Sequence, residues 1–193
     1  MKLLIGNKAP KFQAKAVVSG EIVSNFSLES FQGKYVVFFF YPLDFTYVCP
    51  TELHAFQEKY EDFKKRNAEL VACSVDSCYS HLAWLRTPKS KGGIEGISYP
   101  LVSDLTRSIA EDYGVLIPDE GIAMRGLYIL DKDNVIRHQV VNDLPLGRSV
   151  DEVLRTLDAL ISYDQHGEVC PANWQVGKKR MTPTKAGLEA YFA

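Results

Sequence analysis

Tyr35-Val36-Val37-Phe38-Phe39-Phe40-Tyr41 is a continuous apolar and aromatic run that ends at Pro42. The run is too short for a globular helix and is rich in residues that favour strands, so it predicts a buried central β-strand. From 50 to 66 the pattern becomes helical, because apolar residues recur three and four positions apart and basic residues gather near the end. We therefore expect a strand that leads into a helix at the centre of the fold.

A second apolar run, 70–75, predicts a second buried strand, and the helical stretch 80–85 that follows it ends before Pro88. Strand, helix and strand in this order form a βαβ unit, in which the two strands pair in parallel. Further along we expect a short apolar segment at 99–102, a helix over 106–113 closed by Gly114, a hairpin of strands 126–130 and 135–141, and a long amphipathic helix over 149–162 that opens with a Ser149-x-x-Glu152 capping box.

This order of elements is that of a thioredoxin-like α/β core. We expect the core to fill residues 1–165, with an N-terminal extension before the first central strand, and a C-terminal arm to fill 166–193. Pro171, Gly177 and Pro183 interrupt any long element in the arm. Trp174 and the pair at 191–192 need an apolar surface to pack on, and a partner subunit is the natural candidate.

Composition limits the classes of function. With 193 residues, of which 46% are hydrophobic, the chain can bury a sizeable core without disulfide staples. The net charge of −2 argues against nucleic-acid binding, and the brief basic cluster at 178–180 is typical of a solvated tail. The apolar stretch 1–5 is too short for a signal segment or a membrane span, so we expect a cytoplasmic protein with no membrane partner.

The cysteines are the first candidates for chemistry, because four at irregular spacings do not make a disulfide-rich scaffold. Cys49 lies at the expected helix start, where unpaired N–H groups and the helix dipole favour an anionic thiolate. A buried, unreactive thiol is the alternative. Cys73 is expected in the core and Cys78 at a partly exposed position, both without a catalytic role. The four histidines lack any metal-binding spacing, so neither a metal nor a cofactor is expected.

The sequence around Cys49 carries a family resemblance. The stretch 42–52, PLDFTYVCPTE, resembles the peroxidatic active-site loop of typical 2-Cys peroxiredoxins, and its Pro-x-x-x-Thr-x-x-Cys frame is highly specific. Further matches extend over nearly the whole chain, at 74–77, 81–84, 125–126, 143–149 and 169–174. The resemblance implies a thiol-dependent peroxidase that reduces hydrogen peroxide and alkyl hydroperoxides in antioxidant defence and redox homeostasis.

The resemblance also assigns roles in the peroxide reaction. Cleavage of an O–O bond by a thiolate requires alignment of the peroxide with the sulfur and donors for the charge that develops on its oxygens. By the family's pattern, Thr46 places its hydroxyl beside the Cys49 thiolate, and Pro42 shields the sulfur from water. Arg125 supplies a permanent positive charge, with a structural ion pair as its alternative role. Glu52 holds the active-site arginines, and it occupies the position where a thioredoxin-type dithiol needs its second cysteine.

Attack on peroxide leaves a sulfenic acid, which condenses with a second thiol to form a disulfide. The resemblance implies that Cys170 resolves Cys49 across a homodimer, and that five such dimers form a decamer. The alternative for Cys170 is a buried small hydrophobe. A helical cysteine cannot reach a partner beyond about 7 Å without backbone movement, so we expect the first turn of the Cys49 helix to unwind in each cycle.

Two other classes of function are consistent with the residues alone: a general thiol–disulfide oxidoreductase, and a holdase-like or scaffold oligomer whose reactivity is incidental. For the peroxidase, the expected electron donor is either thioredoxin or a flavoprotein disulfide reductase. Family members that are readily over-oxidised carry a Gly-Gly-Leu-Gly loop and a C-terminal Tyr-Phe pair. The match here is partial, since the corresponding residues read Gly92-Gly93-Ile94-Glu95 and Tyr191-Phe192.

Overall fold

A computed structural model of the protein describes residues 2–193, which divide into two compact units. The first unit ends at Arg148 and the second is Ser149–Ala193. The predicted boundary between residues 165 and 166 lies near the end of helix α5 (Val150–His166), within the second unit. The division into a peroxidase domain, 1–165, and an arm, 166–193, stays a prediction.

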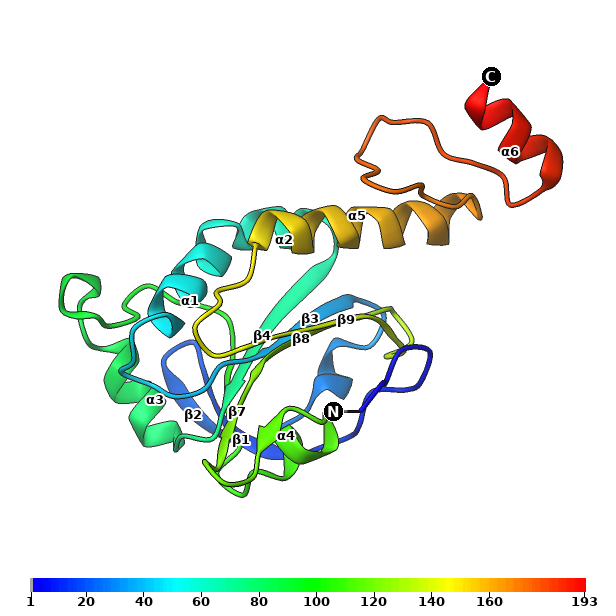
Figure 1. The fold of residues 1–193 in the computed structure, drawn as a ribbon. Coiled ribbons are helices and arrows are strands. Elements are labelled where there is room, and N and C mark those ends of the chain that lie inside the picture. The colour runs from blue at the N-terminus through cyan, green and yellow to red at the C-terminus, as the bar shows by residue number, and fades with distance from the viewer. Residues whose placement is uncertain (1) are drawn as a thin grey trace. The chain divides into compact units, whose positions relative to one another are not determined.

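The first unit is built on a mixed sheet of seven strands in the order β2-β1-β5-β4-β3-β8-β9 (Figure 1). The predicted parallel pairing of the two central strands is confirmed, since β3 pairs in parallel with β4, and β4 with β5. The other neighbours pair antiparallel. The seven strands are β1 (Ala14–Val18), β2 (Glu21–Phe26), β3 (Tyr35–Phe40), β4 (Ala68–Ser74), β5 (Leu101–Ser103), β8 (Arg125–Leu130) and β9 (Ile136–Asn142).

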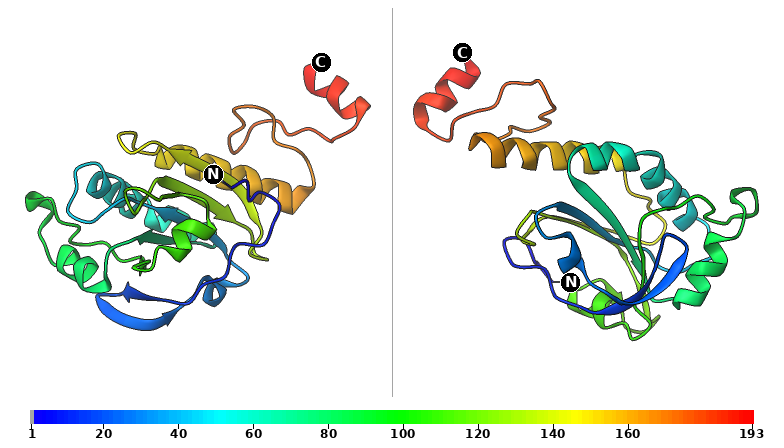
Figure 2. Two further views of the ribbon diagram at one scale, coloured as in Figure 1. Left: turned by 60° about the horizontal axis from the view of Figure 1, so that its bottom comes forward. Right: turned by 180° about the vertical axis from the view of Figure 1, so that it is seen from behind.

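Helices cover both faces of this sheet (Figures 1 and 2). The helices and short elements of the first unit are α1 (Cys49–Glu58), α2 (Tyr60–Lys65), α3 (Cys78–Leu85), α4 (Ser108–Asp112), the 3₁₀ turns η1 (Leu28–Phe31) and η2 (Lys89–Lys91), and the small hairpin β6 (Leu116–Ile117) and β7 (Ile122–Ala123). The second unit holds α5 and α6 (Lys185–Phe192). No helix among residues 2–193 is long and apolar enough to cross a membrane.

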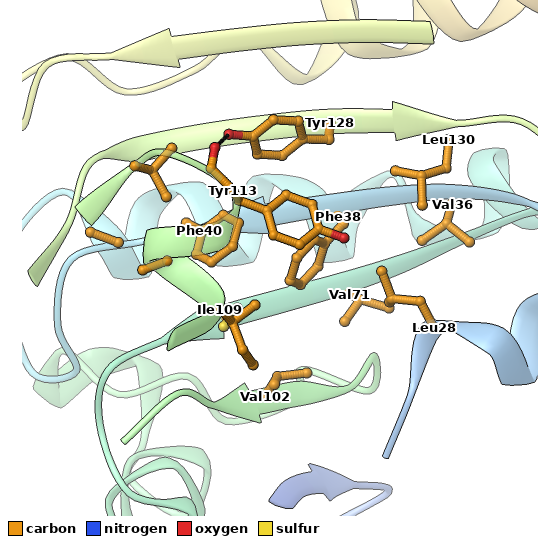
Figure 3. Close-up of a cluster of buried hydrophobic side chains, with 14 of the residues drawn as sticks. Leu28, Val36, Phe38, Phe40, Val71, Val102, Ile109, Tyr113, Tyr128 and Leu130 are labelled. Atoms are coloured by element: carbon orange, nitrogen blue, oxygen red, sulfur yellow. Dashed lines mark hydrogen bonds between the residues drawn. The ribbon is translucent and has the colours of Figure 1, made fainter. Parts of the chain in front are cut away.

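The central strand β3 packs against aromatic rings on both faces, because its side chains alternate in direction. On one face Phe38 lies edge-on to Tyr113, which follows α4, with ring centroids 5.0 Å apart (Figure 3). On the other face Phe39 stacks on Phe56 of α1 at 4.2 Å. Every residue of β3 is buried, as predicted, so the strand is a rigid support for the loop that follows it.

Some predicted elements differ from the structure. The single helix expected over 50–66 is two helices, α1 and α2, which meet at Lys59, where the backbone leaves the helical region. The N-terminal extension contains the hairpin β1–β2, and β1 continues the sheet beside β5. In the arm, Thr184 caps the unpredicted helix α6 by accepting a hydrogen bond from the Gly187 N–H.

Two cysteines outside the expected site, Cys73 and Cys78, are buried in this fold. Cys73 is fully buried in β4, as predicted, and burial raises the pKa of its thiol well above the usual range, with the Asp104 charge as a smaller cause. The prediction that Cys78 is partly exposed is wrong, since only 3% of its surface is accessible. The reason is that Ser77 caps α3 and turns Cys78, the first helical residue, into the interior.

Candidate active site

Cys49 is the first residue of α1 and lies just after the loop that leaves β3, as the sequence predicted. The chain turns into the helix at Val48, which serves as the cap without a side-chain hydrogen bond, and Pro50 occupies the first turn. Proline is tolerated there because the N–H that it lacks has no partner inside the helix. The Cys49 side chain is fully buried, and its sulfur lies at the positive end of the α1 dipole.

Arg125 provides the positive charge nearest to the sulfur. Its Nη1 lies 3.4 Å from Cys49 Sγ. The antiparallel pairing of β8 with β3 explains this proximity, because the first residue of β8 then lies beside the end of β3 that leads to Cys49. The Arg125 Nε donates a hydrogen bond of 2.7 Å to Leu144 O, which fixes the plane of the guanidinium.

Glu52 lies between two buried guanidinium groups. Its Oε2 accepts from Arg125 Nη1 at 2.7 Å and from Arg148 Nη2 at 2.9 Å, and its Oε1 accepts from Arg148 Nε at 2.7 Å. Arg148 Nη1 also donates to Phe40 O and Gly126 O, both at 2.8 Å. Two guanidinium groups and one carboxylate leave one uncompensated positive charge next to the Cys49 sulfur. Buried charges require a partner, so this arrangement favours an anion at the sulfur.

Arg148 is the site residue that the sequence analysis did not single out. The sequence analysis included Arg148 only as part of the matched stretch 143–149. Because Glu52 was expected to hold more than one arginine, that role could have pointed to Arg148 as a second one. The residue is 9% exposed, and its backbone N–H also donates to Glu52 at 2.8 Å. Arg148 therefore holds Glu52 in the orientation that meets Arg125.

Pro42 and Thr46 line a hollow of about 360 Å³ that reaches Cys49 and Arg125. The Thr46 hydroxyl donates to Leu43 O at 2.9 Å, so it must rotate before it can donate toward the sulfur. The volume is sufficient for a hydroperoxide with a small organic group. The rest of the lining is mostly apolar and consists of Leu43, Tyr47, Val48, Ile122, Leu144 and Pro145.

Asp76, two residues after β4, holds the loop between β3 and α1 through hydrogen bonds. Its Oδ2 accepts from the Asp44 backbone N–H at 2.9 Å and from the Ser74 hydroxyl at 2.8 Å, and its carbonyl accepts from the Ser103 hydroxyl at 2.7 Å. Burial, followed by the charge of Asp44, raises the pKa of the Asp76 carboxyl above its ordinary value of 3.8. The folded protein therefore retains this proton at a pH at which the unfolded chain has lost it.

This shift predicts how Asp76→Asn changes stability with pH. The folded carboxyl binds its proton more tightly than the unfolded one, so protonation stabilises the fold. This stabilisation is fully present below the ordinary pKa and is lost as the pH rises through the folded pKa. The amide keeps an oxygen that can accept both hydrogen bonds and does not titrate. We expect the free energy of unfolding of Asp76→Asn to rise relative to the unmodified protein between pH 4 and pH 7, measured by urea denaturation. Asp119→Asn, at an exposed position, is the control and should follow the unmodified protein. If the difference in free energy of unfolding between Asp76→Asn and the unmodified protein stays constant across this pH range, the prediction is contradicted.

Cys170 lies in the second unit, on the segment after α5. Its side chain is half-buried and its Sγ lies 3.5 Å from Ala159 O. A two-stranded bridge holds this segment, since Val169 and Met181 exchange backbone hydrogen bonds of 2.9 and 3.1 Å. Trp174, which was expected to need an apolar surface, is 4% exposed, and its carbonyl accepts a hydrogen bond from Arg155 of α5.

Known proteins resemble the chain along its whole length. Residues 5–139 match the AhpC/TSA family, and residues 159–193 match the C-terminal domain of 1-Cys peroxiredoxin. The chain belongs to the AhpC/TSA family of peroxiredoxins. The chloroplastic 2-Cys peroxiredoxin BAS1 of Hordeum vulgare is 54% identical over 191 residues, which is 98% of this chain and 90% of that protein. A thioredoxin peroxidase of Echinococcus granulosus is 50% identical over all of both chains. The reduced 2-Cys peroxiredoxin of Plasmodium vivax superposes with a TM-score of 0.95 at 46% identity, over 99% of each chain.

These likenesses confirm the predicted family, the thioredoxin-like fold and the class of activity. The protein is a thiol-dependent peroxidase, and thus an oxidoreductase. The structure brings Pro42, Thr46, Cys49, Glu52 and Arg125 together in the first unit. Their individual roles, and that of Cys170, remain predictions.

Proposed function

We propose that this peroxiredoxin reduces hydroperoxides through attack by the Cys49 thiolate. The sulfur forms a bond with the distal oxygen of ROOH, the O–O bond breaks, and the leaving alkoxide takes a proton and departs as alcohol, or as water when R is hydrogen. The products are a Cys49 sulfenic acid and ROH. The observation that carries the proposal is the 3.4 Å approach of Arg125 Nη1 to Cys49 Sγ within a buried cluster that has one positive charge in excess.

The neighbouring residues have separate roles in this step. The Arg125 guanidinium stabilises the thiolate and the charge that develops on the peroxide oxygens, because an arginine stays protonated and offers several N–H donors. Thr46 supplies a hydroxyl beside the sulfur after rotation, and Pro42 limits the access of water. Glu52 is a positioning residue that acts by fixing the two arginines, and the mostly apolar wall of the hollow suits alkyl hydroperoxides as well as hydrogen peroxide.

Cys170 of the partner subunit resolves the sulfenic acid in this proposal. Its thiol attacks the oxidised sulfur, a disulfide forms, and the oxygen leaves as water. Since Cys49 is fully buried in the first turn of α1, that turn must unwind for the two sulfurs to meet. Thioredoxin, as the name of the Echinococcus granulosus relative suggests, or a flavoprotein disulfide reductase then restores both thiols. We assign the protein to homodimers that assemble as decamers.

A non-reducing gel tests this cycle. One equivalent of peroxide should convert the protein into a covalent dimer of twice the 21.7 kDa chain mass, which dithiothreitol reverses. Cys170→Ser should still consume one equivalent, form no covalent dimer and stop at a sulfenic acid that dimedone labels. Cys78→Ala, which removes a buried thiol outside the cycle, should form the covalent dimer normally. An intramolecular disulfide in the unmodified protein, or a covalent dimer in Cys170→Ser, would contradict the proposed resolution.

A further inference from the structure

Asp44 is a buried acidic residue of the active-site loop, and the peroxide reaction described above does not use it. Its side chain is 1% exposed and faces His81 of α3, which is fully buried. The His81 Nδ1 lies 2.8 Å from Asp44 Oδ2, and the Tyr41 hydroxyl donates to Asp44 Oδ1 at 2.8 Å. Both oxygens of this carboxyl group therefore have a partner inside the protein.

The proton positions in this group follow from the acceptors around it. His81 Nε2 lies 3.1 Å from Val102 O, and a carbonyl can only accept, so Nε2 carries a hydrogen. The contact between His81 Nδ1 and Asp44 then holds one further proton. Burial, followed by the Asp44 charge, raises the pKa of Tyr41 well above its usual range, so its hydroxyl remains a donor. The group is fully satisfied, which rigidifies it.

Asp44 is also tied through its main chain. Its N–H donates to Asp76 at the end of β4, and His81 itself is tied to β5 through Val102. The next residue, Phe45, has a φ of 55°, a left-handed conformation that residues with a side chain rarely adopt. The Phe45 ring packs 5.7 Å from the Trp84 ring of α3. The loop is thus fixed to α3, β4 and β5 immediately before it turns toward Thr46.

The Asp44–His81 contact anchors the loop, and Asp44 lies in the chain between two residues of the peroxide site, Pro42 and Thr46. Leu43, which precedes Asp44, contributes the carbonyl that accepts from the Thr46 hydroxyl. Pro42 lies two residues before Asp44 and lines the hollow. The first turn of α1, which must unwind for resolution, begins five positions after Asp44. The anchor therefore holds the part of the site that orients peroxide, and the part that must move lies beyond it.

We propose that the buried Asp44–His81 pair is a positioning device that holds residues 42–46 in the peroxide-binding geometry before the first turn of α1 unwinds. The inference rests on the proposed chemistry at Cys49. It assigns the pair to one step of the cycle. Reaction with peroxide needs the anchor, because displacement of a reacting group by about 1 Å can cost about 10²-fold in rate. Disulfide formation does not need it, because the sulfur has by then left the site.

Asp44→Ala is the variant that removes the anchor. We expect its rate constant for peroxide consumption in a single turnover, measured by stopped flow, to fall by about 10²-fold. The rate of the subsequent disulfide formation, measured by acid quench and non-reducing gel, should stay within about twofold of the unmodified protein, a margin well below that loss. Asp44→Asn should recover most of the first rate, because its amide oxygen can accept from Tyr41 and its NH₂ can donate to a neutral His81 Nδ1.

His81→Gln and Asp104→Asn complete the experiment. His81→Gln keeps a donor for Val102 O and removes the imidazole contact with Asp44, so it should reproduce the selective loss even if Asp44→Ala does not fold. Asp104 is 1% exposed, and its carboxylate accepts from the N–H groups of Ile109 and Ala110 of α4. Asp104→Asn is the matched control for disturbance of a buried acid and should leave the ratio of the two rates unchanged.

The outcomes separate the inference from the function on which it rests. If the unmodified protein consumes peroxide through Cys49 and the folded variants lose only the first rate, the positioning role holds. The positioning role would be overturned if the variants lost peroxide consumption and disulfide formation equally. It would also be overturned if Asp44→Ala and His81→Gln consumed peroxide as fast as the unmodified protein. If the unmodified protein does not consume peroxide at Cys49, the proposed function fails instead.

Discussion

Cys49→Ser is expected to abolish peroxide consumption. The hydroxyl of serine is not ionised near neutral pH, so the excess positive charge of Arg125 and Arg148 has no thiolate to stabilise. Oxygen is also the poorer nucleophile toward a peroxide. Removal of a catalytic nucleophile in a well-studied hydrolase costs on the order of 10⁶-fold in rate, and a loss of that size would leave no detectable turnover. Competition with horseradish peroxidase for hydrogen peroxide measures the second-order rate constant directly.

Cys73→Ala is the control for this experiment. Cys73 is as completely buried as Cys49, but burial raises the pKa of its thiol and no guanidinium among its described contacts offsets this effect. Its loss should leave the rate with peroxide unchanged. Both variants should also unfold cooperatively, which separates a chemical loss from a folding defect. Peroxide consumption by Cys49→Ser at the normal rate would place the reaction at another thiol and refute the site.

The central part of the fold follows from local sequence. The run that became β3 is apolar at every position, which is typical of a strand covered on both faces, and the helical pattern after Pro50 starts where α1 starts. Local patterns also set the position of Cys49, since the end of an apolar strand and the start of a helix are both visible in the sequence. The placement of Arg125 beside Cys49 needed the family resemblance, because it depends on the antiparallel pairing of β8 with β3.

Other features depend on long-range contacts and were missed. Strand β1 exists because its backbone pairs with β5, and the sequence of β2 is mostly exposed and carries little apolar pattern. The Arg148 side chain interacts with Glu52, Phe40 and Gly126, which lie far from it in the chain. A single arginine in a loop gives no local sign of such a network, and the one indirect signal was the expected role of Glu52 in holding more than one arginine.

Arg125→Lys is the second change with a large expected effect, because a lysine cannot reproduce the geometry of the guanidinium. Arg125 donates from Nη1 to both Cys49 Sγ and Glu52, and from Nε to Leu144 O. The ammonium of a lysine is a compact charge on a flexible stem, and its strong attraction to Glu52 would draw it away from the sulfur. The positive charge would remain in the cluster while the donor aimed at the peroxide would be lost.

We expect the second-order rate constant of Arg125→Lys with hydrogen peroxide to fall by about 10²–10³-fold, the cost of removing one donor to a developing oxyanion. Iodoacetamide alkylation should be slower too, since the thiolate loses its nearest donor. Arg137→Lys is the matched control, because Arg137 pairs with Asp131 at 3.1 Å in a partly exposed position on β9, and its rate should not change. A normal peroxide rate in Arg125→Lys would mean that a positive charge of any geometry suffices. Glu52 would then serve to keep the charges buried together rather than to aim a donor at the reacting oxygen.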